Sequence, residues 1–123
     1  MRYLILIHSN PQSRQIFEGL SEQQRVAFGQ AHFGLTDELA DSGELVVSEG
    51  LPDPSTATRV SVRDGRIVTS DGPFAEVKEY LAGLYLVDCE SLERAVQIAA
   101  KAPDAASGYV EVRPVYDMSQ FDQ

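Results

Sequence analysis

Apolar residues occur along the chain in short runs of strand length, separated by two longer stretches with helical spacing. The run at residues 2–8 is apolar in both of its alternating sets, which are Tyr3, Ile5 and Ile7 on one side and Leu4 and Leu6 on the other. A strand with two apolar faces is typical of one that is covered on both sides. Further strands are predicted at residues 44–48, 57–62, 66–69, 80–88 and 109–115.

The first helix is predicted to begin at Ser21, because Gln24 at the third following position completes a capping box. Gly43 is a suitable end for this helix. The apolar stripe of the helix consists of Phe28, Leu35 and Leu39, with Ala31 at its edge. His32 falls inside this stripe, so its side chain is expected to face the rest of the molecule.

The second helix is predicted to follow Ser91 as its N-cap and to end at Pro103. Asn10-Pro11 is expected to break the chain after the first strand, and Asp64-Gly65 to form a hairpin turn. The order of elements is then strand, helix, strand with an inserted hairpin, strand, helix and strand. This order predicts one domain, residues 1–123, of the α+β class with the ferredoxin-like βαββαβ arrangement.

The two helices of such a domain cover one face of a four-stranded sheet, whereas the first strand is apolar on both faces. A second subunit is the simplest cover for the remaining face. The sequence therefore predicts a homodimer.

Charge and cysteine content exclude several classes of function. The formal net charge is −9, from 19 acidic and 10 basic residues, so nucleic acid, which needs a basic surface, is not an expected partner. Cys89 is the only cysteine, which rules out an intrachain disulfide and a thiolate zinc site and is typical of a reducing cytoplasm. The apolar runs are too short for a signal peptide or a membrane span. With no spaced ligand motif, neither a metal nor an organic cofactor is expected.

Three motifs occur in an order that resembles a known family. They are Asp71-Gly72-Pro73-Phe74-Ala75-Glu76, Leu84-Tyr85-Leu86-Val87-Asp88 and Val110-Glu111-Val112-Arg113-Pro114-Val115, accompanied by Ser48-Glu49-Gly50-Leu51. The combination is similar to the YCII-related, DGPF-domain family over nearly the whole chain. The resemblance implies a dimeric α+β barrel, in which two ferredoxin-like sheets pack face to face around a cavity. It also implies a link to extracytoplasmic-function sigma factors, beside which members of the DGPF branch are often encoded.

The resemblance further implies a His–Asp pair, with His32 as the histidine and Asp41 as the acid. A neutral imidazole is able to act as an acid or a base near neutral pH. Nine residues along a continuous helix place two side chains about 180° apart. The helix must therefore end or bend before Asp41, or the acid lies elsewhere, and Asp37 is no better at about 140°. The alternative is that His32 is a core histidine bonded to backbone carbonyls.

The segment Asp71-Gly72-Pro73-Phe74 has two interpretations. Pro73 fixes its own φ and favours an extended Gly72, while Asp71 accepts backbone N–H bonds in an Asx-type turn. These preferences explain the whole segment as a fold device, which is the favoured interpretation. In the other interpretation Asp71 faces a cavity as a base or ligand acceptor.

Glu111 and Arg113 alternate with valines in the last strand. If the valines meet the helices, both charged side chains face the dimer cavity, where Tyr85 of a neighbouring strand is expected to join them. Such a lining suits an anionic or hydroxylated small organic ligand. The alternative is an ion pair at the rim. His8, at the end of the first strand, is a further candidate for this cavity.

Three functions fit these features. The first is a cofactor-free enzyme for proton transfer, isomerisation or elimination on a small organic molecule, with His32 as base, a carboxylate to orient it and Arg113 as anion clamp. The second is a non-catalytic ligand-binding module with the same cavity. The third is an interaction partner in sigma-factor signalling. The sequence leaves all three open.

Overall fold

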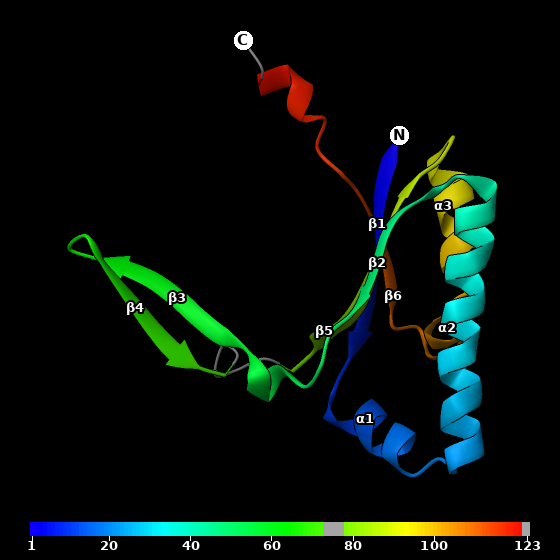
Figure 1. Ribbon diagram of the computed structural model, residues 1–123, viewed down its shortest axis with the longest axis horizontal. Coiled ribbons are helices and arrows are strands. Elements are labelled where there is room, and N and C mark those ends of the chain that lie inside the picture. Colours follow the sequence, from blue (N-terminus) through cyan, green and yellow to red (C-terminus); the bar gives the residue numbers. More distant parts are fainter. Residues whose placement is uncertain (73–77, 122–123) are drawn as a thin grey trace.

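The centre of the molecule is a four-stranded antiparallel sheet with the strand order β2-β5-β1-β6. A computed structural model describes residues 1–72 and 78–121. The strands of this sheet are β1 (Arg2–Ser9), β2 (Leu45–Gly50), β5 (Tyr80–Asp88) and β6 (Val110–Pro114). Two helices, α2 (Glu22–Ser42) and α3 (Leu92–Ala99), cover one face of the sheet (Figure 1). This arrangement is compatible with the predicted ferredoxin-like α+β fold.

The helix ends carry the local signals that the sequence predicted. Ser21 and Gln24 exchange side chain to backbone hydrogen bonds at the start of α2, and the helix ends at Gly43, whose φ is 81°. This value lies in the left-handed region that favours glycine. The Ser91 hydroxyl accepts a hydrogen bond from the backbone N–H of Arg94 and begins α3. Both predicted helix starts are therefore confirmed.

A further helix, α1 (Pro11–Glu18), lies between β1 and α2 and was not predicted. Asn10 is its N-cap: the Asn10 side chain accepts a hydrogen bond from the Ser13 N–H, and the Ser13 hydroxyl accepts one from the Asn10 N–H. Pro11 takes the first helical position, where a missing N–H removes no helical hydrogen bond. The expected chain break is thus a helix start. Since α1 has no buried residue, the hydrophobic pattern gave no sign of it.

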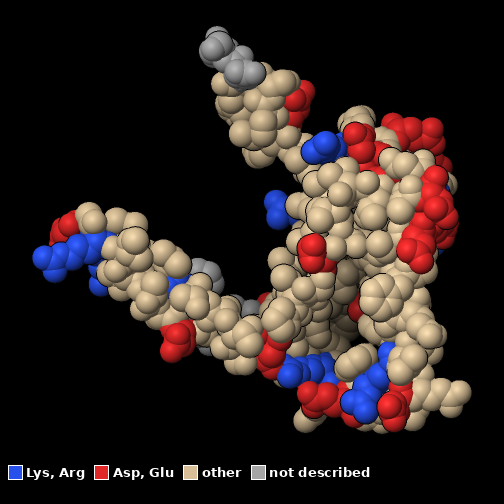
Figure 2. Space-filling model, viewed as in Figure 1, with Lys and Arg blue, Asp and Glu red and all other residues tan. Residues whose placement is uncertain are grey.

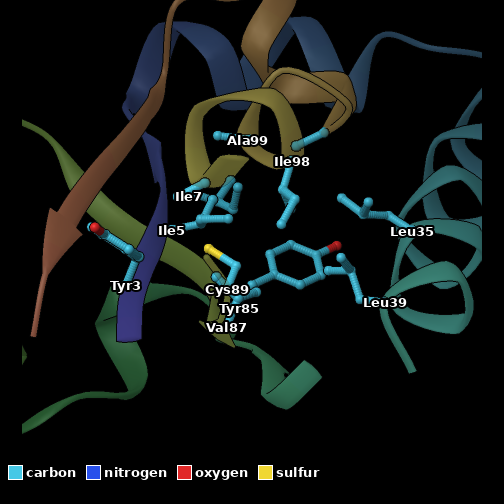
Figure 3. Close-up of a cluster of buried hydrophobic side chains, with 12 residues drawn as sticks. Tyr3, Ile5, Ile7, Leu35, Leu39, Tyr85, Val87, Cys89, Ile98 and Ala99 are labelled. Carbon is cyan, nitrogen blue, oxygen red and sulfur yellow. The ribbon is translucent and has the colours of Figure 1, made fainter. Parts of the chain in front are cut away.

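The core lies between the sheet and the two covering helices (Figure 3). Buried side chains come from alternate positions of β1 and β5 and from the inner faces of α2 and α3: Tyr3, Ile5, Ile7, Tyr85, Val87, Leu35, Leu39, Ala95, Ile98 and Ala99. Val110 and Val112 of β6 pack against this cluster. Glu111 and Arg113 therefore lie on the opposite, open face of the sheet, because strand residues alternate between faces.

A second, two-stranded sheet projects from the body on the side away from the helices (Figure 1). Its strands β3 (Thr58–Arg63) and β4 (Arg66–Asp71) follow the short 3-10 helix η1 (Pro54–Thr56), and every residue in both strands is exposed. Asp64 and Gly65 join them with φ values of 51° and 75°, which confirms the predicted hairpin turn. The C-terminal 3-10 helix η3 (Met118–Phe121) projects on the same side. No helix in the described ranges is both long and apolar enough to cross a membrane.

Candidate functional site

His32 lies in the middle of α2 and has a hydrogen-bond partner at each ring nitrogen. Nδ1 is 2.6 Å from the Tyr85 hydroxyl, and Nε2 is 2.7 Å from Oδ1 of Asp104. The His32 and Asp104 side chains are only 25% and 17% exposed. When Nε2 carries the proton it donates to Asp104, and Nδ1 then accepts from Tyr85. We call these three residues the Asp104–His32–Tyr85 chain.

Three separate elements bring this chain together. Tyr85 belongs to β5 and lies in the core, with its hydroxyl pointing toward α2 (Figure 3). Asp104 belongs to η2 (Pro103–Ser107), a 3-10 helix that begins at the proline predicted to end the second helix. The His32 ring packs edge-to-face with Phe28, at 5.2 Å between centroids, and stacks with Tyr85 at 6.0 Å. Two rings and two hydrogen bonds therefore fix the orientation of the imidazole.

Burial controls the protonation of Tyr85. Burial raises the pKa of Tyr85 above its ordinary value of 10.0, a hydrogen bond with Thr36 acts in the opposite direction, and the charge of Asp104 adds to the rise. The phenol consequently keeps its proton at neutral pH. Toward a neutral imidazole with its proton on Nε2, Tyr85 is the hydrogen-bond donor, and its hydroxyl also lies 3.4 Å from the His32 carbonyl oxygen.

A cavity of about 640 Å³ lies beside the Asp104–His32–Tyr85 chain. Figure 2 shows a hollow in the surface above α1. Asp104 lies in the wall of this cavity, whereas His32 and Tyr85 are not among the described residues that line it. Asp104 is therefore the member of the chain that meets the cavity. The apolar part of the wall includes Ile16 and Phe17 of α1, Leu20 between the two helices and Phe28 of α2. Its polar part includes His8, Ser9, Arg14, Asp53, Tyr80 and Tyr109.

The predicted pairing of His32 with Asp41 is not formed. The helix α2 runs without interruption to Ser42, so nine residues turn Asp41 about 180° away from His32. Asp41 is exposed, and both nitrogens of His32 are held by other residues. The acid beside His32 is Asp104, which lies 72 positions further along the chain. A role of Asp41 in catalysis remains a prediction without a contact to support it.

The expected grouping of Tyr85 with Glu111 and Arg113 is also not formed. Tyr85 and Val112 both lie opposite Ile5, so Tyr85 shares the covered face with the valines. Glu111 instead meets His8 on the open face, where His8 Nε2 is 3.1 Å from Glu111 Oε1. His8 lines the large cavity, and His8 and Glu111 both line a second cavity of about 300 Å³.

Arg113 and Asp71 are exposed and are not among the described residues that line either cavity. Asp71 ends β4 opposite Thr58. Gly72 has a φ of 83°, which only glycine adopts readily, rather than the extended backbone expected beside a proline. Pro73 and Phe74 lie outside the described residues, so both interpretations of this segment remain predictions.

Sequence reasoning missed Asp104 and all the cavity residues of α1. The one available signal was the Asn10-Pro11-Gln12-Ser13 capping sequence, which identifies α1 as a helix but not as a cavity wall. Among the described residues, no group of three or more His, Cys, Asp or Glu side chains is placed to hold a metal ion.

Two similarities to known proteins accompany this geometry. The model of the YCII-related domain family matches residues 1–119. An uncharacterized protein from Rhizobium meliloti (strain 1021) is 38% identical over 80 residues, which cover 63% of this chain and 64% of the relative. The chain thus spans slightly less than two thirds of the length of that relative. Neither description specifies a reaction.

Proposed function

This chain belongs to the YCII-related domain family, as its motifs predicted, and we propose that it is a cofactor-free enzyme acting on a small organic molecule. The reaction class is proton transfer, isomerisation or elimination. The observation that carries the proposal is the Asp104–His32–Tyr85 chain beside a cavity large enough for such a molecule.

The Asp104–His32–Tyr85 chain supports proton transfer because it offers a carboxylate to the ligand and keeps that carboxylate in place. Asp104 is the cavity-facing base, and its Oδ1 receives a hydrogen bond from Nε2 of His32. When Nε2 carries the proton, Tyr85 donates to Nδ1, and the two hydrogen bonds hold the ring in one orientation. In this arrangement Asp104 takes the proton and His32 orients it, which reverses the roles expected from the sequence.

Non-catalytic ligand binding is the second candidate function, and one observation favours it. Both ring nitrogens of His32 already have partners within the protein, as a histidine in a purely structural network also would. In that case the cavity binds a ligand, and the Asp104–His32–Tyr85 chain only stabilises the structure of the cavity wall. The two candidates differ in whether Asp104 exchanges protons with the ligand.

Deuterium exchange separates the two candidates. A panel of small ketones, hydroxyketones and phenols is incubated with the protein in D₂O, and deuterium incorporation is followed by ¹H NMR. We expect the wild type to accelerate exchange in at least one compound, and Asp104→Asn to slow it about 10²–10⁴-fold. Asp41→Asn, an equivalent change on the exposed side of α2, is the control and is expected to behave as wild type.

The catalytic proposal is wrong if a folded Asp104→Asn protein exchanges every compound as fast as the wild type. It is also wrong if Asp41→Asn loses as much rate as Asp104→Asn. The first result leaves ligand binding as the function. The second result assigns the catalytic carboxylate to Asp41 in α2.

We also propose that the protein works as a homodimer, with the open faces of two sheets packed together as a dimeric α+β barrel. The open face carries Leu4, Leu84 and Leu86, which are partly exposed, and Leu6, which is only 8% exposed; all four alternate with the core residues. The projecting hairpin and the C-terminal segment add highly exposed apolar side chains on that side, with Ile67 76% and Tyr116 77% exposed. An apolar surface of this kind is typical of a protein interface.

Sedimentation at micromolar concentration tests the dimer. We expect twice the chain mass for the wild type and the single-chain mass for Leu84→Asp, since a buried carboxylate opposes association. Val26→Asp places the same charge on an exposed position of α2 and is expected to remain dimeric. A wild type that sediments as one chain contradicts the proposal.

A further inference from the structure

We propose that the 640 Å³ cavity accepts small ring compounds that carry a hydroxyl or ammonium donor and excludes carboxylates and other anions. The inference rests on the proposed function only in that it concerns the same cavity. It narrows the ligand class expected from the sequence, which included anions.

The first support is the count of charged groups on the wall. Among the described residues that line the cavity, Arg14 is the one lysine or arginine, whereas Asp53 and Asp104 are both acidic. The residues outside the described ranges, 73–77 and 122–123, contain no lysine or arginine. No further basic side chain of this chain is therefore available to bind an anion in the cavity.

The second support is that Arg14 is already neutralised. Its Nε donates to Glu18 Oε1 at 3.0 Å, and its Nη1 forms an ion pair with Asp53. The hydrogen bond with Glu18 raises the pKa of Arg14, and a hydrogen bond with Tyr80 adds to the rise. One guanidinium and two carboxylates leave this group with a net negative charge. In Figure 2 the basic and acidic side chains are interspersed at the end of the molecule that carries α1.

The third support comes from His8, the histidine of the wall. Its Nε2 lies 3.1 Å from Glu111, so a proton gained by His8 is matched by a carboxylate. The whole chain carries a formal charge of −9, which adds a long-range repulsion of anions. The charges near the cavity and the net charge of the whole chain therefore both disfavour the binding of anions.

The remaining wall defines what does bind. Phe17 and Phe28 meet edge-to-face at 5.4 Å between centroids and offer an aromatic surface to a ring. Asp104 uses Oδ1 for His32, and no described residue donates a hydrogen bond to its Oδ2. A hydroxyl or ammonium group on the ring is able to donate to that oxygen, and an ammonium also gains from the aromatic faces. A carboxylate would place two acceptors against one another.

Three probes with the same ring test the inference: benzyl alcohol, benzylammonium and benzoate. Each is titrated into wild-type protein carrying ¹³C-labelled phenylalanine, and the ring signals of Phe28 and Phe17 report binding. We expect benzyl alcohol and benzylammonium to shift these signals with an affinity at least about tenfold higher than that of benzoate. The series compares ligands on one protein and does not depend on any variant.

The Asp104→Asn variant then tests whether Asp104 is the residue that selects for a donor group on the ligand. Asparagine retains an acceptor oxygen but removes the charge, so we expect about a tenfold loss for benzylammonium and a loss of less than about threefold for benzyl alcohol. Asp37→Asn, on the exposed side of α2, is the matched control and should leave all three affinities unchanged.

Benzoate binding that equals or exceeds that of benzyl alcohol would overturn the inference, as would a failure of all three probes to shift Phe28. These outcomes are distinct from a failure of the proposed enzyme. A cavity that ranks the probes as expected but never exchanges deuterium disproves catalysis alone. Benzoate binding at least as tight as benzyl alcohol binding, together with deuterium exchange in the ketone and phenol panel, disproves the charge selection and leaves catalysis standing.

Discussion

Each side of the sheet carries one histidine paired with a carboxylate, and the two pairs differ in their surroundings. On the covered side, His32 and Asp104 are 2.7 Å apart, with side chains 25% and 17% exposed. On the open side, His8 and Glu111 are 3.1 Å apart, and Glu111 is 52% exposed. His32 has a second partner in Tyr85 and lies against two aromatic rings.

The difference shows that packing, rather than residue type, fixes the geometry of such a pair. An exposed carboxylate exchanges its partner for water at little cost, whereas a partly buried one must keep its hydrogen bond. The covered side is therefore the side that is able to hold a reactive group in one position. The open side offers an apolar surface flanked by projecting segments, which suits association.

The largest expected contrast between the two sides is in stability. Ile5 is 0% exposed in the core, and Ile67 is 76% exposed on the hairpin. We expect Ile5→Ala to lower the free energy of unfolding by about 2–5 kcal/mol, because it leaves a cavity among fixed neighbours. Ile67→Ala in dilute protein should change it by less than about 0.5 kcal/mol. Urea unfolding measures both losses, and equal losses would contradict the difference in packing between the core and the hairpin.

An intermediate contrast is expected for the two carboxylates. Asp104→Asn should lower the free energy of unfolding by about 1–3 kcal/mol, since it weakens a hydrogen bond to a charged, partly buried group. Glu111→Gln should cost about 0.2–1 kcal/mol, as is usual for an exposed pair. Thermal melts of both variants provide the measurement. If Glu111→Gln proves the more damaging, the open side is more tightly packed than this structure shows.

The smallest expected contrast concerns a second ion pair of the covered side. Arg94 donates through Nε and Nη2 to Glu44 at 2.9 and 2.8 Å, and this contact lowers the pKa of Glu44 from 4.5 to about 2. Because the folded pKa is the lower one, the stabilisation is complete above pH 4.5 and is lost as the pH falls toward 2. Solvent reduces its size to roughly 1 kcal/mol, since both side chains are partly exposed.

Glu44→Gln tests this pH dependence against Glu49→Gln, a change at an exposed position of β2. At neutral pH we expect Glu44→Gln to be less stable than wild type and Glu49→Gln to match it. The difference between Glu44→Gln and wild type should shrink as the pH approaches 2. A difference that stays constant from neutral to acid pH would assign the effect to packing instead of charge.

Features whose hydrogen bonds close within a few residues were predictable from the sequence alone. The caps at Ser21, Ser91 and Gly43 and the turn at Asp64-Gly65 are confirmed, because each depends on groups three or four positions apart. The strands followed from their runs of apolar residues. The α1 helix was missed although Asn10, Pro11 and Ser13 carry its signal, because α1 has no buried face to give a hydrophobic period.

The candidate site, in contrast, depends on contacts between residues that are far apart in the sequence. Tyr85 and Asp104 are 53 and 72 positions from His32, and no local preference selects a partner at such a distance. The sequence also did not determine which face of the sheet Tyr85 would occupy. Leu84 and Leu86 alternate with Tyr85 and Val87, and both sets are apolar. Packing of β5 against α2 and α3 chose the Tyr85 set, and η2 then placed Asp104 against the imidazole. The chemistry of the site therefore comes from how the elements pack, which the order of residues does not state.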